Sequence, residues 1–182
     1  MVNFLNTIVK TAYANLWMLT HGYKTGLITS EGKFPLLVSG GKIQIGKLGL
    51  NGFIAPVQIG AVKKGSLKVG RNVFINQGAS VVSHLEITIG DNVKIGDFVA
   101  IYDSDFHPIE PSKELTLAPV HIKEGAWIGR SAIILPGVTV GANSVVAAGS
   151  VVTKSVPPAT LVAGVPARFV RTLDTKKGWI RP

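Results

Sequence analysis

Apolar residues return at every sixth position along much of the chain. The longest series is Ile122, Ile128, Ile134, Val140, Val146 and Val152. Four places after each of these comes a small or aliphatic residue: Ala126, Ala132, Val138, Ser144, Ser150 and Val156. The same spacing runs earlier from Val69 to Val81, slips by two residues, and resumes from Ile89 to Ile101. A period of six does not match the 3.6-residue period of a helix, so the pattern indicates a repeat architecture.

A six-residue repeat predicts a triangular prism, in which each hexapeptide forms one short strand and a corner. Three hexapeptides make a coil of about 18 residues, and the parallel strands pair with the coils above and below. The aliphatic residues point inward and stack one coil apart: Ile122 on Val140, Ile128 on Val146, and Ile134 on Val152. Corner tripeptides such as Gly90-Asp91-Asn92 and Gly141-Ala142-Asn143 supply residues that tolerate a positive φ. We therefore expect an all-β solenoid.

The pattern divides the chain into three parts. Residues 1–40 lack the repeat and are predicted to form a helical cap, residues 41–157 form the prism, and residues 158–182 form a C-terminal tail. The apolar stripe of the helix consists of Phe4/Leu5, Ile8/Val9, Ala12/Tyr13 and Leu16/Trp17. Because a solenoid core is open at its end, we expect this helix to cap it. Docking of the helix on a membrane is the alternative, for which a polar face with one lysine is a weak signal.

The first coils of the prism fit the repeat poorly. Residues 41–68 are expected to be irregular, with Ile43, Ile45 and Ile59 pointing inward.

A long insertion interrupts the repeat between Ile101 and Ile122. It exceeds one hexapeptide by about 15 residues, and a solenoid accommodates such an insertion only at a corner. We therefore predict an extruded loop over residues 102–121, with His107 near its root and Pro108 restricting the backbone behind it. An imidazole there can accept a proton from a hydroxyl group. Our hypothesis is that Asp103, Asp105 or a backbone carbonyl orients the ring; a surface histidine without a role is the alternative.

Composition narrows the chemistry. The 182 residues include no cysteine, which excludes a cysteine nucleophile, thiolate zinc sites and disulfides. A formal net charge of +9 favours anionic partners, such as cofactor phosphates or an anionic membrane surface. We expect no nucleic acid, because basic residues are not interleaved with aromatic ones. The sequence has no transmembrane run and no signal-peptide pattern, so we expect a cytoplasmic protein. Peripheral association with the inner face of the membrane is compatible with this expectation.

Three segments resemble a known family. Tyr102-Asp-Ser-Asp-Phe-His-Pro-Ile-Glu-Pro111 resembles the segment with the catalytic histidine in hexapeptide-repeat acyltransferases. The similarity is to galactoside, maltose and nodulation-type enzymes, and above all to O-acetyltransferases of capsular or exported polysaccharides. Ala126–Val138, and Ala147–Pro158 followed by Ala163–Arg168, are similar to the coenzyme-binding coils of that family. The resemblance covers roughly residues 41–171.

The resemblance implies a fold and a reaction. The fold is a left-handed parallel β-helix assembled as a homotrimer, with acetyl-CoA in a groove between subunits. The reaction is acetyl transfer to a hydroxyl of a sugar or of a surface or exported polysaccharide precursor. His107 is the general base, transfer is direct, and no metal is required.

The resemblance also implies the site residues. The catalytic set is His107 with Asp103 and Asp105, and the acceptor-binding set is Asn76, Ser83 and His84. The coenzyme-binding set is Trp127, Arg130, Ala147, Ala148, Thr153, Lys154, Arg168 and Arg171. At the position of Ser83 the sugar acetyltransferases often carry an Asp, and this departure argues against free galactoside or maltose as the acceptor.

Three alternatives stay open. An N-acetyltransferase could act on a nucleotide- or lipid-linked amino sugar. A γ-type carbonic anhydrase would hold zinc with His84, His107 and His121, at spacings that do not resemble that family. A structural β-helix without activity is the third.

Overall fold

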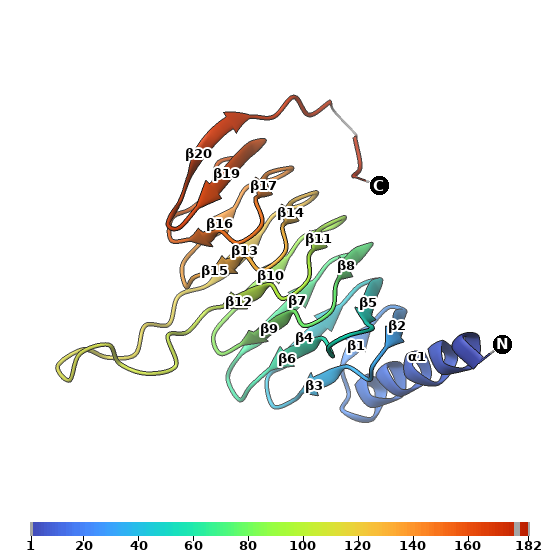
Figure 1. Ribbon diagram of the computed structural model, residues 1–182. Helices are drawn as coiled ribbons and strands as arrows, with labels where there is room; N and C mark the ends of the chain where they lie inside the picture. The colour runs from blue at the N-terminus through green and yellow to red at the C-terminus, as the bar shows by residue number, and fades with distance from the viewer. Residues whose placement is uncertain (1, 177–178, 182) are drawn as a thin grey trace.

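The chain forms a three-sided parallel β-solenoid of about 7 turns with one helix across its N-terminal end (Figure 1). The computed structural model describes residues 2–176 and 179–181, with side chains from Leu5 onward. Helix α1 covers Val2–Thr20. From β1 to β18, successive strands lie on successive walls of the prism, so that each wall is a sheet built from every third strand.

We name the three walls sheets A, B and C. Sheet A contains β1 (Lys24–Thr25), β4 (Lys42–Ile45), β7 (Ser66–Val69), β10 (Ile87–Ile89), β13 (Val120–Ile122) and β16 (Thr139–Val140). Sheet B contains β2 (Ile28–Gly32), β5 (Leu48–Gly52), β8 (Val73–Ile75), β11 (Lys94–Ile95), β14 (Trp127–Ile128), β17 (Val145–Val146), β19 (Thr160–Gly164) and β20 (Ala167–Thr172). Sheet C contains β3 (Leu36–Val38), β6 (Gln58–Ala61), β9 (Ser80–Ser83), β12 (Ala100–Tyr102), β15 (Ile133–Ile134) and β18 (Val151–Val152).

The core consists of the inward aliphatic ladder that the repeat predicts. Ile122 pairs in register with Val140, Ile128 with Val146, and Ile134 with Val152, so the predicted stacking is confirmed. The small residues that follow each of them are buried as well, from Ala126 to Val156. At the corners, Asn92 and Asn143 adopt the positive φ predicted for those tripeptides, 61° and 56°.

The solenoid begins earlier than predicted. Strands β1, β2 and β3 precede residue 41 and belong to sheets A, B and C, so the first coil starts at Lys24. The predicted boundary at residue 41 is therefore wrong: the cap is the helix alone, and residues 24–38 are part of the prism. Ile43, Ile45 and Ile59 point inward as expected.

Helix α1 caps the prism through an unexpected face. Ala14 and Met18 are fully buried against the first coil. Asn15 bonds both backbone groups of Ile28, accepting from its N–H at 3.1 Å and donating to its carbonyl at 2.7 Å. Thr11 Oγ1 accepts from the N–H of Ser30 at 3.0 Å. The polar side of the helix thus completes the free edge of β2, and most of the apolar stripe faces outward.

Two features leave the prism. Residues 103–119 extend from the corner between β12 and β13 as an arm (Figure 1), where a loop was predicted. At the opposite end from α1, β19 and β20 form an antiparallel hairpin that continues sheet B.

Candidate active site

The arm is a hairpin whose root is tied to the prism. Ser104 and Leu117 form an antiparallel bridge, and the N–H of Asp105 donates to the carbonyl of Thr116 at 3.1 Å. The N–H of Ala118 donates to the carbonyl of Asp103 at 3.1 Å. Beyond this bridged root, His107 is exposed to solvent. The arm therefore presents an imidazole that is accessible to solvent.

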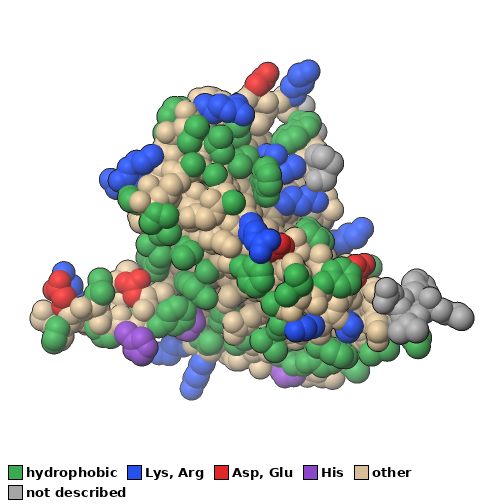
Figure 2. All heavy atoms as spheres, viewed as in Figure 1, with side chains coloured by type: hydrophobic (Ala, Val, Ile, Leu, Met, Phe, Trp, Pro, Cys, Tyr) green, Lys and Arg blue, Asp and Glu red, His purple; other side chains and the backbone are tan. Residues whose placement is uncertain are grey.

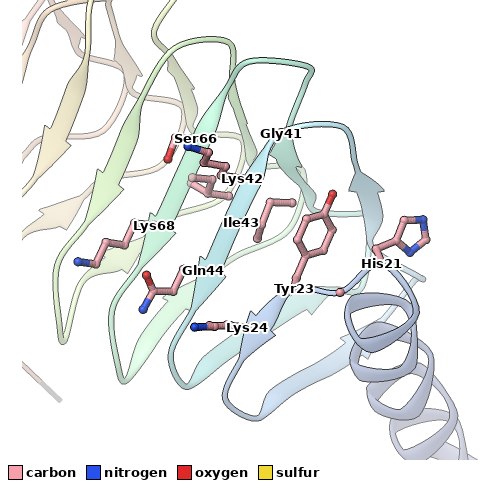
Figure 3. A pocket seen from close by; sticks show the side chains of 11 residues that line it. His21, Tyr23, Lys24, Gly41, Lys42, Ile43, Gln44, Ser66 and Lys68 are labelled. Atoms are coloured by element: carbon pink, nitrogen blue, oxygen red, sulfur yellow. The ribbon is translucent and has the colours of Figure 1, made fainter.

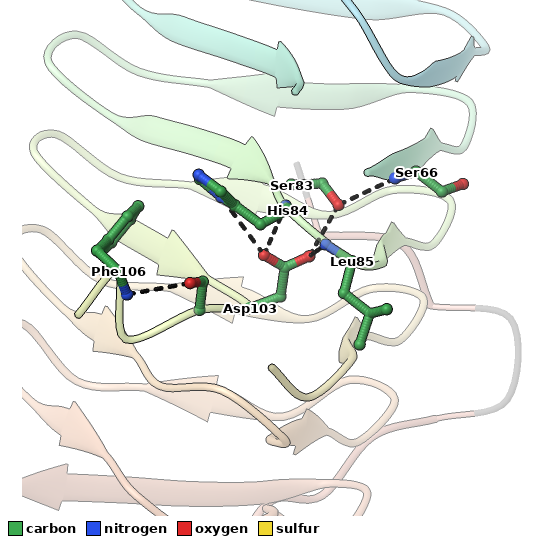
Figure 4. A network of polar contacts seen from close by, with 7 residues as sticks. Ser66, Ser83, His84, Leu85, Asp103 and Phe106 are labelled. Carbon is green, nitrogen blue, oxygen red and sulfur yellow. Dashed lines mark hydrogen bonds and ion pairs between the residues drawn. The ribbon is translucent and has the colours of Figure 1, made fainter. Parts of the chain in front are cut away.

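Asp103 anchors that root from inside the protein (Figure 4). Its carboxylate is fully buried and accepts three hydrogen bonds at 2.8 Å, from the hydroxyl of Ser83 and the N–H groups of His84 and Leu85. A buried carboxylate needs such donors to compensate its lost hydration. We predicted that Asp103 orients the His107 ring. Both of its carboxylate oxygens instead accept hydrogen bonds from residues 83–85, so Asp103 positions the arm.

Asp105 and Ser83 also differ from their predicted roles in orienting His107 and in binding the acceptor sugar. The side chain of Asp105 makes no hydrogen bond within the described part of the chain; its backbone carbonyl accepts from the N–H of His107 at 2.7 Å. Ser83 is fully buried, and its hydroxyl donates a hydrogen bond to Asp103. The hydroxyl is therefore not available to contact an acceptor sugar. Ser83 is therefore withdrawn from the acceptor-binding set.

His84 lines a hollow beside the root of the arm. Its ring is in edge contact with Phe106, with centroids 5.0 Å apart, and Phe106 contacts Tyr102 in the same way at 5.0 Å. These rings enclose a hollow of about 360 Å³ on sheet C, together with Gln58 and Ser80. Nδ1 of His84 is buried, has no hydrogen-bond partner among the residues that the structure describes, and lies 3.8 Å from the carboxylate of Asp103. Aromatic rings next to amide and hydroxyl groups fit a sugar.

Asn76 lies at a different corner of the prism. It follows β8 of sheet B and lines a hollow of about 490 Å³ with Phe74, Lys94 and Trp127. The C-terminal segment reaches the same place: the guanidinium of Arg181 lies 5.3 Å from the ring of Trp127 and 4.7 Å from that of Trp179. Burial lowers the pKa of Arg181 from its ordinary value. Asn76 and Trp127 thus share one hollow, whereas His107 belongs to the arm that leaves the corner between sheets C and A.

The predicted coenzyme residues occupy the last coils and the terminal hairpin. Ala147 and Ala148 form the turn after β17, Thr153 and Lys154 follow β18, and Arg168 and Arg171 lie on β20. Within the described residues, the two β20 guanidiniums bond only to backbone carbonyls of their own strand, at 3.1 and 3.4 Å. Uncompensated cations of this kind suit phosphate groups.

Arg130 differs from the other predicted coenzyme residues. It lies 3.5 Å from the carboxylate of Asp97 and 5.5 Å from the ring centroid of Phe98. Its side chain is 65% exposed, so this contact leaves it accessible, and its place in the coenzyme-binding set stays a prediction.

Sequence reasoning missed several residues at these hollows. Phe74 and Tyr102 lie on strands β8 and β12 next to the inward aliphatic positions, and Phe106 lies on the arm, so none of the three belongs to the repeating inward pattern. Trp179 and Arg181 lie at a terminus, where the basic and aromatic composition was the only signal.

The histidines are not gathered around a common centre. His121 Nδ1 lies 2.7 Å from the hydroxyl of Thr88 and 3.8 Å from Glu86, away from His84 and His107. Among residues 2–176 and 179–181, no three His, Cys, Asp or Glu side chains form a group that could hold a metal ion. The zinc-based alternative has no support in this arrangement.

Comparison with known proteins places the chain among acetyltransferases. Residues 119–154 match the family model of the bacterial transferase hexapeptide (six repeats). The chain is 32% identical over 155 residues to the galactoside O-acetyltransferase of Lactococcus lactis, covering 83% of this chain and 72% of that protein. It is 38% identical over 114 residues to the galactoside O-acetyltransferase of Escherichia coli, a match that spans 61% of this chain and 56% of the relative.

A solved structure agrees with these relatives. A galactoside acetyltransferase in complex with coenzyme A is 38% identical and superposes with a TM-score of 0.59, covering 70% of this chain and 64% of that one. The chain therefore belongs to the hexapeptide-repeat acetyltransferase family. It spans only about half of the length of the E. coli relative, 56%.

Proposed function

We propose that this protein is an acetyl-CoA-dependent O-acetyltransferase that acts on a hydroxyl group of a sugar or of a surface or exported polysaccharide precursor. The observation that carries the proposal is the accessible imidazole of His107 on an arm whose root is anchored by a buried carboxylate. Nothing about the six-residue repeat alone requires such an arm, and the hydrogen bonds of Asp103 at its root support a functional role for the arm.

In the proposed reaction, His107 takes the proton from the acceptor hydroxyl as its oxygen attacks the thioester carbonyl of acetyl-CoA. The tetrahedral intermediate then collapses, the C–S bond breaks, and the imidazolium returns the proton to the departing thiolate. The products are an acetyl ester and free coenzyme A. The chain has no cysteine, which is consistent with direct transfer. General-base catalysis by an imidazole contributes typically about 10²–10⁴-fold, and holding both substrates together supplies more.

The proposed donor site is the last coils and the terminal hairpin. Ala147 and Ala148 lack long side chains, so an extended pantetheine arm can approach the backbone there. Lys154, Arg168 and Arg171 are exposed and face no carboxylate among the described residues, and Thr153 adds a hydroxyl. These residues are the ones we assign to the phosphates, with Trp127 next to the thioester end.

The proposed assembly is a homotrimer. Asn76 and Trp127 line a hollow on sheet B, while the arm with His107 leaves from another corner of the same prism. A site that uses all three residues therefore needs the arm of one subunit beside the sheet B corner of its neighbour. A closed symmetric ring satisfies this requirement for every subunit at once. Because the donor is acetyl-CoA, we place the enzyme in the cytoplasm.

For the acceptor we propose Asn76 and His84 as contacts. Asn76 can donate and accept hydrogen bonds, and His84 lies in a hollow with Tyr102 and Phe106.

The test is release of the coenzyme A thiol from acetyl-CoA against a panel of sugars, amino sugars and oligosaccharide acceptors. We expect turnover with a hydroxyl acceptor, and a loss of about 10²–10⁴-fold in His107→Ala. Lys113→Gln is the matched control, since Lys113 lies on the same arm and forms an ion pair with Glu110 at its tip. Ester formation that survives in His107→Ala would remove the base from the mechanism. Acetylation confined to amino groups would favour an N-acetyltransferase instead.

A further inference from the structure

Helix α1 exposes an unusual amount of apolar surface. Successive helical residues are 100° apart, so Leu5, Ile8, Leu16 and Leu19 share one face. Their exposed fractions are 65%, 48%, 61% and 69%. The opposite face is already used, because Ala14 and Met18 pack on the first coil. The outward apolar face therefore has no role in closing the prism.

The apolar surface continues beyond the helix into the first two coils. Tyr13 on the exposed side of α1 is in edge contact with Phe34, with centroids 5.1 Å apart. Phe53 and Ile54 at the corner between β5 and β6 are 61% and 68% exposed. In Figure 2, hydrophobic side chains gather along the lower edge of the molecule, where Figure 1 places α1. Exposed apolar side chains gathered at one end of a molecule are typical of an interaction site.

Nearly all the net charge of the chain lies at the same end. Residues 1–71 contain nine basic residues (Lys10, Lys24, Lys33, Lys42, Lys47, Lys63, Lys64, Lys68 and Arg71) and one acidic residue, Glu31, so 9 − 1 gives +8. The whole chain has 19 basic and 10 acidic residues, which leaves 10 − 9, or +1, for residues 72–182. Within the described chain, Arg71 pairs with Asp91 at 2.8 Å, and none of the eight lysines forms an ion pair.

Strand register gathers several of these lysines on one wall. Lys24 pairs with Gln44, and Gln44 pairs with Lys68, so the three side chains lie side by side on sheet A (Figure 3). With Lys42 they line a hollow of about 500 Å³ that extends to His21 and Tyr23 at the end of the helix. Successive coils are about 4.8 Å apart. The lysines of the first three coils therefore span about 10 Å along the axis of the prism, a distance comparable to the Debye length of about 8 Å at physiological ionic strength.

We propose that the N-terminal end of the prism docks on the surface of an anionic phospholipid bilayer. Helix α1 lies in the interface with its apolar face toward the acyl chains, and the lysines of the first coils face the headgroup phosphates. The combination of an apolar helical face with a basic rim is what such a surface recognises. No helix of the described chain is long and apolar enough to cross a membrane, so the contact is peripheral.

A second copy of the chain fits this surface less well. Two such ends brought face to face would place two groups of eight uncompensated positive charges against each other, which opposes association. A bilayer with anionic headgroups supplies the opposite charge and an apolar phase together. For the helix, docking on a membrane was the alternative left open by the sequence, and the outward apolar face and the charge distribution now favour it.

The test is co-sedimentation of the full chain with vesicles of phosphatidylcholine alone or with about 30% phosphatidylglycerol. We expect binding to the anionic vesicles only, weakened by salt. Ile8→Glu/Leu16→Glu should weaken it at least about tenfold, because the apolar contact is lost. The triple variant Lys24→Gln/Lys42→Gln/Lys68→Gln should also weaken it at least about tenfold, since each lysine near an anionic surface contributes measurably.

Matched controls separate these effects from general changes of charge or hydrophobicity. Lys113→Gln/Lys123→Gln/Lys176→Gln removes the same charge from the other part of the chain, and Ile109→Glu/Phe169→Glu introduces the same two carboxylates at other exposed apolar positions, 78% and 65% exposed. Both should bind vesicles like the unmodified protein. Equal binding to neutral vesicles, or unchanged binding of the helix variant, would overturn the proposal. So would a helix variant that dissociates an oligomer without lipid, because the face would then lie between copies.

This proposal is independent of the reaction. His107→Ala should bind vesicles normally, and the helix variant should keep its turnover with a soluble acceptor. Vesicle binding without any acetyl transfer would therefore count against the proposed function alone.

Discussion

Asp103 shows how one residue in a family motif can serve a different purpose from its neighbours. The sequence places it four residues before His107, and proximity in sequence favoured a role in orienting the ring. In the structure, its carboxylate accepts hydrogen bonds from Ser83, His84 and Leu85. These residues form the segment where the six-residue repeat slips by two. A slip leaves backbone N–H groups without strand partners, and a buried carboxylate satisfies them. Sequence spacing could identify the slip in the repeat and the motif around His107, but not the hydrogen bonds that join Asp103 of the motif to the residues of the slip.

We predict that Asp103→Asn destabilises the protein by about 1–3 kcal/mol, because an amide cannot accept hydrogen bonds on both of its terminal atoms and leaves a buried donor unpaired. The arm should also become more mobile. Urea unfolding measures the first effect, and the rate of tryptic cleavage at Lys113 measures the second. Asp105→Asn serves as the comparison, since that side chain has no hydrogen bond in the described structure. Equal stabilities of the two variants would show that the Asp103 bonds contribute little.

At the scale of elements, the helix shows the limit of periodicity. The apolar stripe correctly predicted an amphipathic helix, but a helical wheel says only which residues share a face. The free edge of β2 decides which side of the helix packs on the prism, because the backbone N–H and C=O groups of that edge require hydrogen-bond partners. Asn15 and Thr11 supply them. The first coil was missed because the apolar positions of β1 to β3 do not keep the six-residue spacing.

We predict that Asn15→Leu lowers the free energy of unfolding by about 1–3 kcal/mol, although it adds an apolar residue to a helix. The change leaves the N–H and the carbonyl of Ile28 without partners at a buried position. Leu16→Asn is the reciprocal control on the adjacent, 61% exposed position and should change stability by less than about 0.5 kcal/mol. Chemical denaturation gives both values, and hydrogen exchange of the Ile28 amide should accelerate in the first variant only. A neutral or stabilising Asn15→Leu would mean that water replaces the lost bonds.

At the scale of the whole molecule, the six-residue repeat predicted the stacking of the coils residue by residue, because each inward position depends only on its neighbours one coil away. It could not assemble the site, because the site residues occupy different corners. His107 is on the arm between sheets C and A, and Asn76 and Trp127 are on sheet B. Nothing local in the sequence records that separation. The prism keeps its corners apart, so the site that we propose needs contact between molecules to bring the two groups together.

This separation leads to a prediction about mixed oligomers. If each site combines His107 of one subunit with Asn76 of the next, then His107→Ala and Asn76→Ala chains are both impaired alone but restore intact sites when mixed. In a trimer formed at random from equal amounts, a given junction has the intact pair with a probability of about one quarter. Co-refolding the two variants should therefore raise thiol release from acetyl-CoA to about one quarter of the unmodified level, whereas mixing them without dissociation should not. If co-refolded mixtures show only the average of the two variants, each chain carries its own complete site. The arm would then have to fold back onto its own prism, which its bridged root at Ser104 and Leu117 opposes.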